Sequence, residues 1–165
     1  MNRVLNERFI NPIGDRMLKL SDIMNRDVFT LSASAPADQA AWELATRGFT
    51  GAPVRDDTGR LVGVLSRSDL MDPERNAGSS LGDKEVQDLM TRAIFALDPQ
   101  APVIRAIRLM VREGIHRVIV MDDHHQMVGI VTSTDVMNAL ARGELSQTEY
   151  PMGFGAEHSQ ATASM

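Results

Sequence analysis

Apolar and polar positions follow the same succession of patterns twice along this chain. In the first half, β-branched and aromatic residues at 28–31 predict a short strand. Apolar residues at helical spacing over 37–45 predict an amphipathic helix that ends near a glycine. Apolar runs at 52–54 and 61–65, separated by a polar turn, predict a β-hairpin, and a second helix follows the hairpin as far as Pro73.

The second half repeats this pattern in register. Residues 20–71 align with residues 86–137 without a gap, and identical pairs occur throughout. These pairs include Asp22/Asp88, Met24/Met90, Phe29/Phe95, Pro36/Pro102, Gly48/Gly114, Gly63/Gly129 and Asp69/Asp135. Because chance similarity does not preserve spacing in this way, we infer an internal duplication.

Each repeat is predicted to be a strand–helix–strand–strand–helix unit, which is too small to bury a stable core by itself. We therefore expect an α+β fold in which two β-α-β-β-α repeats pack together with pseudo-two-fold symmetry. The chain divides into an N-terminal arm (1–17), a first repeat (18–73), a linker (74–83), a second repeat (84–142) and a flexible C-terminal tail (143–165).

Composition narrows the class of protein. An apolar content of 43% with 24% charged residues is typical of a folded globular chain. The absence of cysteine excludes disulfides, thiolate metal sites and a cysteine nucleophile. No apolar run approaches the roughly 20 residues that cross a bilayer, and no secretory signal is visible, so we expect a cytoplasmic protein without a membrane partner. A net charge of −5 argues against a nucleic-acid partner.

Each predicted hairpin ends on the same motif, in which a hydroxyl residue closes the strand and a carboxylate follows three positions later. The two instances run from Gly63 to Asp69 and from Gly129 to Asp135. A carboxylate accepts two hydrogen bonds at once and suits the paired hydroxyls of a ribose. The hydroxyl residue, beside the free N–H groups of a helix start, suits a phosphate oxygen. The same spacing also defines a capping box, which only satisfies the first helical turn, and the sequence leaves both roles open.

The two copies differ just before the second predicted strand. His116 and Arg117 stand in the second copy where the first copy has Thr50 and Gly51. Arginine offers a planar fork of donors that matches phosphate, and histidine adds a donor or a positive charge. We therefore expect two unequal sites, with the firmer phosphate contact supplied by the second copy. The alternative is a surface arginine that pairs with an acidic side chain.

The duplicated unit resembles the cystathionine-β-synthase (CBS) domain, and residues 18–142 resemble a tandem CBS pair, or Bateman module. The resemblance rests on the duplication, the order of predicted elements and the two motifs in register. It implies binding of AMP, ADP or ATP, or less often of S-adenosylmethionine or NAD, in clefts between the repeats. The candidate ligand-binding residues are Phe29, Thr30, Thr50, Gly51, Ser66, Arg67, Ser68, Asp69, Phe95, His116, Arg117, Thr132, Ser133, Thr134 and Asp135.

This resemblance implies a stand-alone regulatory module that senses adenine nucleotides, needs no cofactor or metal, forms a homodimer and signals to an unidentified protein. The alternative is a ligand-free scaffold of the same fold that only dimerises or docks a partner. An enzyme is not expected, because no P-loop, Gly-x-Ser-x-Gly or His-Glu-x-x-His pattern occurs in the sequence.

Overall fold

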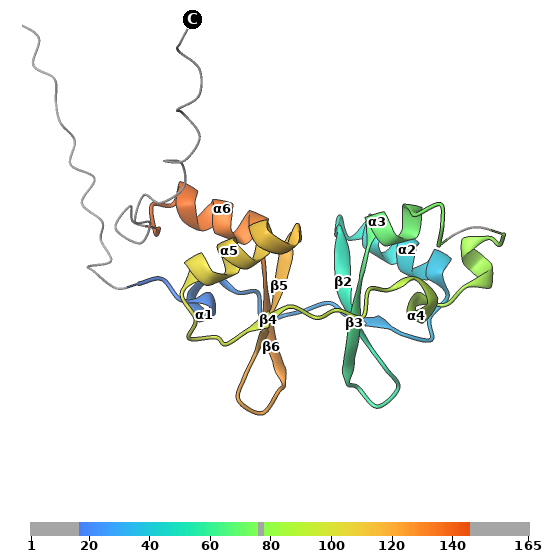
Figure 1. Cartoon of the computed structure of the whole chain (residues 1–165), viewed down its shortest axis with the longest axis horizontal. Coiled ribbons are helices and arrows are strands. Elements are labelled where there is room, and N and C mark those ends of the chain that lie inside the picture. The colour runs from blue at the N-terminus through green and yellow to red at the C-terminus, as the bar shows by residue number, and fades with distance from the viewer. Residues whose placement is uncertain (1–16, 76–77, 146–165) are drawn as a thin grey trace, which may run out of the picture.

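The computed structural model of the chain describes residues 17–75 and 78–145 (Figure 1). The predicted N-terminal arm before residue 17, the tail after residue 145 and linker positions 76–77 lie outside the described residues. Two three-stranded sheets stand side by side along the long axis. They contain β1 (Leu31–Ser32), β2 (Gly51–Arg55) and β3 (Leu61–Ser66), and β4 (Ala96–Leu97), β5 (Arg117–Met121) and β6 (Met127–Thr132).

The predicted α+β fold with two like repeats is confirmed. In each sheet the first strand runs parallel to the second, and the second pairs antiparallel with the third. The main helices are α2 (Ala37–Thr46) and α3 (Arg67–Met71) in the first repeat, and α5 (Val103–Glu113) and α6 (Ser133–Ala141) in the second. All four lie on one side of the long axis, which we call the helical end of the molecule, and both hairpin turns project on the opposite side (Figure 1). No helix of the described residues is long and apolar enough to span a membrane.

The first predicted strand is shorter than its sequence pattern indicates. In the second repeat, Ala96 pairs with Ile119, whose N–H donates to the Phe95 carbonyl at 2.9 Å. The position equivalent to Ile119 in the first repeat is Pro53, which has no N–H to donate. The ladder therefore begins one residue later, at Leu31, and residues 28–30 run alongside the sheet without pairing.

Each repeat donates a short helix to the other repeat's core. Helix α1 (Leu20–Ile23) opens the first repeat, yet Leu20 is buried in the second core, and its N–H donates to the Ala101 carbonyl of that repeat at 2.9 Å. Helix α4 (Val86–Leu89) completes the first core in the same way, just after the short 3-10 helix η1 (Leu81–Asp83). The chain crosses between the repeats twice near the centre of the molecule (Figure 1).

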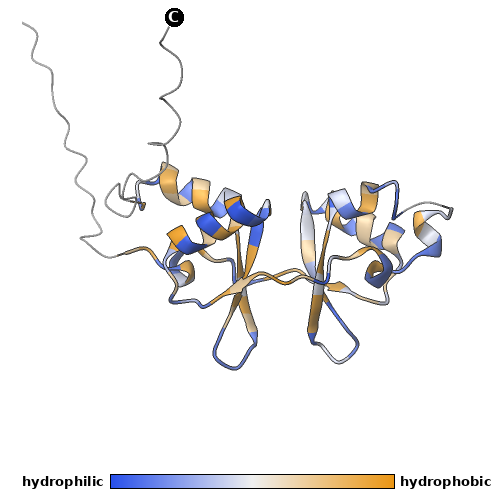
Figure 2. Cartoon of the chain, in the orientation of Figure 1, coloured by the Kyte–Doolittle hydropathy of each residue, from blue (hydrophilic) through white to orange (hydrophobic). Residues whose placement is uncertain are grey.

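Buried apolar side chains form two clusters, one in each repeat. Figure 2 shows that hydrophobic residues occur on the strands and helices of both repeats. The fully buried members include Leu44, Val54, Leu65, Val86 and Leu89 in the first cluster, and Leu20, Val103, Val118, Val120 and Val131 in the second. Each cluster combines side chains of the sheet with side chains of the short helix that the other repeat donates, α4 in the first cluster and α1 in the second. Burial of these side chains therefore holds the two repeats to each other.

The glycine that opens each motif allows the crossing segments to pass close to the sheets. A Cβ on Gly63 would lie 2.7 Å from the Thr91 carbonyl oxygen and 2.8 Å from Met90 Sδ. At Gly129 the corresponding neighbours are Met24 Sδ at 2.6 Å and the Asn25 carbonyl oxygen at 3.1 Å. The close approach lets adjacent backbone groups pair, so both glycines are required by the packing of the protein itself.

Gly63→Ala tests this close approach. Because the added methyl group meets a backbone oxygen that cannot rotate away, we expect unfolding free energy to fall by about 1–3 kcal/mol. Gly82→Ala is the matched control, since its Cβ would meet side-chain atoms alone, the flexible end of Asp38 at 3.3 Å and Ser80 Oγ at 3.8 Å. Urea denaturation of both variants measures the difference, and equal stabilities would show that the crossing segment adjusts freely.

Candidate functional site

Two clefts lie between the repeats and are related by the duplication. The Asp69 cleft has a volume of about 250 Å³ and is lined by Val64, Ser66, Ser68, Asp69, Thr91, Ala93, Phe95, Gly114, Ile115, His116, Arg117 and Ile119. The Asp135 cleft has a volume of about 590 Å³. Its lining includes the repeat-equivalent of every one of those positions, namely Ile130, Thr132, Thr134, Asp135, Asn25, Asp27, Phe29, Gly48, Phe49, Thr50, Gly51 and Pro53. Both clefts therefore draw on both repeats.

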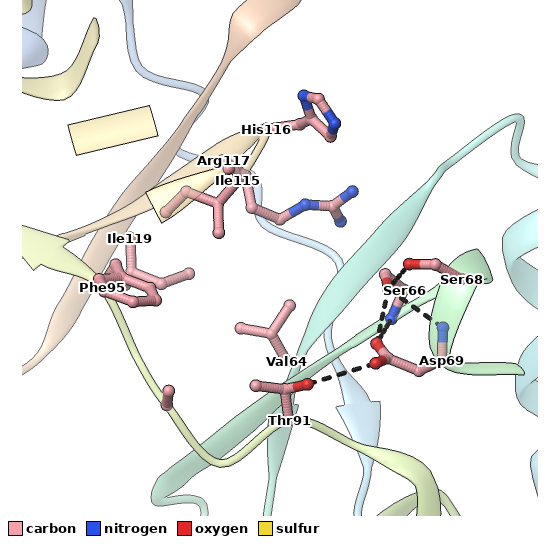
Figure 3. Close-up of a pocket in the computed structure, with 12 residues that line it drawn as sticks. Val64, Ser66, Ser68, Asp69, Thr91, Phe95, Ile115, His116, Arg117 and Ile119 are labelled. Atoms are coloured by element: carbon pink, nitrogen blue, oxygen red, sulfur yellow. Dashed lines mark hydrogen bonds between the residues drawn. The ribbon is translucent and has the colours of Figure 1, made fainter. Parts of the chain in front are cut away.

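Each motif forms a complete capping box at the edge of its cleft. The Ser66 N–H donates to Asp69 Oδ2 at 2.8 Å, and the Asp69 N–H donates to Ser66 Oγ at 3.4 Å (Figure 3). Thr132 and Asp135 form the same pair of hydrogen bonds, at 2.7 and 3.3 Å, at the start of α6. One oxygen of each carboxylate thus satisfies the first turn of its helix.

The other carboxylate oxygen is in different surroundings in the two clefts. Asp69 Oδ1 accepts a hydrogen bond from Thr91 Oγ1 at 3.2 Å and faces Arg75 Nη1 at 3.1 Å. Asn25 stands where Thr91 does in the other repeat, and its side-chain oxygen instead accepts a backbone N–H two residues on. Within the described residues, no hydrogen bond or ion pair engages Asp135 Oδ1. The Asp135 carboxylate therefore keeps an oxygen available to a ligand, whereas both oxygens of Asp69 are engaged.

Arg117 extends from the start of β5 toward the first repeat (Figure 3). Its Nη2 donates to Thr50 Oγ1 at 2.7 Å, and its Nη1 lies only 2.5 Å from where a Cβ on Gly51 would be. Burial lowers the pKa of Arg117, and the nearby Asp69 charge acts in the opposite direction. The side chain remains a cation, because arginine does not lose its proton in proteins. Within the described residues it hydrogen-bonds a hydroxyl rather than a carboxylate, which leaves its charge available to an anion.

An apolar wall faces the polar edge in each cleft. In the Asp135 cleft it consists of Phe29 and Phe49, whose ring centroids are 5.8 Å apart, with the Arg47 guanidinium 4.4 Å from the Phe29 centroid. In the Asp69 cleft Phe95 and Ile119 lie together on the side opposite Asp69 (Figure 3). A flat aromatic group can pack against such a wall while its polar substituents reach the motif.

The structure brings almost all of the predicted site residues to these clefts. Asp69 and Phe95 line the Asp69 cleft, and Ser66, Ser68, His116 and Arg117 line both clefts. Phe29, Thr50, Gly51, Arg67, Thr132, Ser133, Thr134 and Asp135 line the Asp135 cleft. Thr30 lines neither. The sequence did not lead us to predict four further lining residues: Asn25, Thr91, Phe49 and Ile115. Phe49 and Ile115 occupy equivalent positions in the two repeats, and each directly precedes two predicted site residues, which is the signal that could have identified them.

A family model for the CBS domain matches residues 20–73 and 86–142. The solved CBS domain pair of protein MJ0100, in complex with 5-methylthioadenosine and S-adenosyl-L-methionine, is 26% identical, with a TM-score of 0.67 over 79% of this chain and 100% of that chain. The structure of CBSX2 of Arabidopsis thaliana in complex with AMP is 28% identical, with a TM-score of 0.66 over 77% of this chain and 98% of that chain.

Curated relatives extend beyond the region that is shared with this chain. The uncharacterised protein MJ1232 of Methanocaldococcus jannaschii is 27% identical over 124 residues, which is 75% of this chain and 40% of the relative. The A-adding tRNA nucleotidyltransferase of Aquifex aeolicus is 32% identical over 123 residues, which is 74% of this chain and 14% of that enzyme. The similarity thus covers one module that occurs in proteins of different overall architecture.

Stability measurements on two variants separate the capping role from other contacts of the motif carboxylates. Asp135→Ala removes the two hydrogen bonds that Oδ2 accepts from the Thr132 N–H and hydroxyl, both within the capping box, so we expect a loss of about 1 kcal/mol in unfolding free energy. Asp69→Ala also removes the contacts to Thr91 and Arg75, so we expect a loss of about 2 kcal/mol. Thermal denaturation in the absence of ligand measures both, and equal losses would show that the Thr91 and Arg75 contacts add nothing.

Proposed function

The chain belongs to the CBS domain family, and we propose that it is a regulatory module that binds adenine nucleotides between its repeats. In this proposal, AMP, ADP or ATP occupies the clefts, and occupancy is passed on to a separate protein. The observation that carries the proposal is the duplicated cleft itself. Each copy combines a carboxylate at a helix start, an apolar wall and access to the Arg117 guanidinium.

The Asp135 cleft has the better properties for a nucleotide. Asp135 Oδ1 is free to accept from ribose hydroxyls, and a carboxylate is well suited to that pair of donors. Phe29 and Phe49 offer an aromatic surface for the adenine base. Arg67 and Thr134 also line this cleft, and in this proposal the Arg67 guanidinium and the Thr134 N–H, in the first turn of α6, hold a phosphate.

Comparison with the solved neighbours supports the adenosine class of ligand. One neighbour holds AMP, and another holds 5-methylthioadenosine with S-adenosyl-L-methionine. The side chains in the clefts of this chain favour a phosphate-bearing member of that class. Arg67, His116 and Arg117 all line the Asp135 cleft, and guanidinium groups match phosphate oxygens better than they match a sulfonium cation.

The signalling mechanism that we propose is a shift in conformational population. A ligand in either cleft contacts both repeats at once, so it stabilises one arrangement of the two sheets relative to others. The exchanged helices α1 and α4 connect each sheet to the opposite core, so movement at a cleft reaches both cores. A partner protein that binds one arrangement preferentially would then respond to ligand.

Calorimetric titration with AMP, ADP, ATP, S-adenosylmethionine and NAD tests ligand binding. We expect saturable binding of at least one of the three adenine nucleotides. Asp135→Ala should weaken it about tenfold or more, because the ribose loses a charged acceptor worth at least ~1.4 kcal/mol. Asp69→Ala should weaken it less, since both oxygens of Asp69 already have protein partners.

The controls in this titration are the same two variants, whose folding is checked by circular dichroism. Unchanged affinity in both variants would assign the carboxylates to helix capping alone. Absence of binding by all five compounds at millimolar concentration would refute the nucleotide-sensing function and leave a ligand-free scaffold of the same fold.

The helical end of the molecule supports self-association. Large apolar side chains on all four main helices are exposed there: Trp42 on α2, Met71 on α3, Val111 on α5, and Met137 and Leu140 on α6. Met71 and Met137 are 78% and 68% exposed and occupy the same position in the two repeats. A repeated apolar surface suits a symmetric contact with a second copy, so we place the homodimer interface on these helices.

Mutation of the repeated methionines tests the dimer. Size-exclusion chromatography with light scattering should give a dimer for the wild type. The double variant Met71→Glu/Met137→Glu should be monomeric, because two charges per subunit would be buried without partners. His124→Glu, on a hairpin turn at the opposite end, is the control and should remain dimeric. A double variant that stays dimeric would place the interface elsewhere.

A further inference from the structure

The two clefts meet in the middle of the molecule. Ser66, Ser68, His116 and Arg117 line both of them, so ligand groups that point inward from either cleft approach the same few side chains. Among these shared residues, Arg117 carries the permanent charge. Its guanidinium lies between the β5 strand on which it stands and the Ser66–Asp69 edge of the first repeat (Figure 3).

The duplication places a cation on only one side of this meeting point. Position 117 in the second repeat corresponds to position 51 in the first, where the residue is glycine. The Arg117 side chain occupies space that is open only because residue 51 is glycine, since its Nη1 lies 2.5 Å from the position that a Cβ on Gly51 would take. The neighbouring Thr50 then accepts a hydrogen bond from Nη2 at 2.7 Å. A second arginine at position 51 would have no room.

From this geometry we infer that Arg117 is shared between the clefts, so that two phosphate-bearing ligands compete for one guanidinium. This inference rests on the proposed nucleotide function and adds a rule of regulation to it. The first nucleotide draws Arg117 toward its phosphate, and the second then binds to a cleft that has lost its cation and gained a neighbouring negative charge. Binding of two nucleotides is therefore negatively coupled, while binding of two nucleosides without phosphate is not.

Other charges near Arg117 do not remove this competition. Asp69 stands on the Asp69-cleft side and already faces Arg75 at 3.1 Å. Arg67 lines the Asp135 cleft but not the Asp69 cleft, and its counterpart in the other repeat is Ser133. When Arg117 turns toward the Asp135 cleft, the Asp69 cleft keeps His116 but no guanidinium among its lining residues. The Asp69 cleft is consequently the one that loses affinity.

The test compares AMP with adenosine, which lacks the phosphate, in calorimetric titrations of the full chain. For each compound the measured quantity is the ratio of the second to the first dissociation constant, and comparison of the wild type with Arg117 variants isolates the part of this ratio that depends on the Arg117 charge. In the wild type we expect this ratio to be about tenfold larger for AMP than for adenosine, within the usual range of coupling between sites. Binding of one AMP but two adenosine molecules per chain would be the extreme form of the same result.

Arg117→Met keeps the apolar stem and removes the charge. We expect the excess of the AMP ratio over the adenosine ratio to fall severalfold in this variant, leaving only the part that comes from Arg67 in the Asp135 cleft. Arg117→Gln, which retains a donor for Thr50, serves the same purpose if the methionine variant does not fold. A tenfold excess that persists without the Arg117 charge would overturn the inference, as would equal ratios for the two compounds in the wild type.

Failure of the underlying function gives a different result. If neither AMP nor adenosine binds, the nucleotide function is refuted and the coupling with it. If both bind but their ratios agree, only the sharing of Arg117 is refuted.

Discussion

The reciprocal exchange of α1 and α4 is the constraint on which the rest of this structure depends. Leu20 completes the core of the second repeat, and Val86 and Leu89 complete that of the first. Because each sheet needs a helix from the other side of the molecule, the two sheets are held next to each other. The clefts exist only in that arrangement, since each cleft combines residues from both repeats.

The motif carboxylates connect folding to ligand binding. Oδ2 of each aspartate accepts the N–H of the preceding hydroxyl residue, and this contact positions the helix start beside the cleft. Capping and binding are therefore compatible uses of one side chain, because the two oxygens point to different partners. The two aspartates differ because of residues outside the motif. Thr91 and Arg75 contact the second carboxylate oxygen of Asp69, but nothing equivalent among the described residues contacts that of Asp135.

Much of the fold and the candidate site could be predicted from the sequence. The apolar runs separated by a polar turn over 52–65, and their repeat at 118–131, correctly placed both hairpins, and the motif at the end of each hairpin marked one edge of each cleft. The exchanged helices could not be predicted, because four residues are too few to show helical periodicity. Asn25 and Thr91 were missed for the same reason, since only the exchange brings them to a cleft. The late start of the first strand follows from Pro53, a residue on its pairing partner rather than in the strand itself.

Exchange of the short helices also has a consequence for how the chain is made. Helix α1 leaves the ribosome before any other described element, but Ala101, Val118 and Val131, with which it shares a core, are synthesised long afterwards. The first repeat in turn lacks Val86 and Leu89 until the second has begun to emerge. The first half therefore cannot complete its core during its own synthesis, and α1 remains without its core until the second half is made, so the final packing is delayed until nearly all of the chain is free. Because of the exchange, the two repeats complete their cores together, as one folding unit.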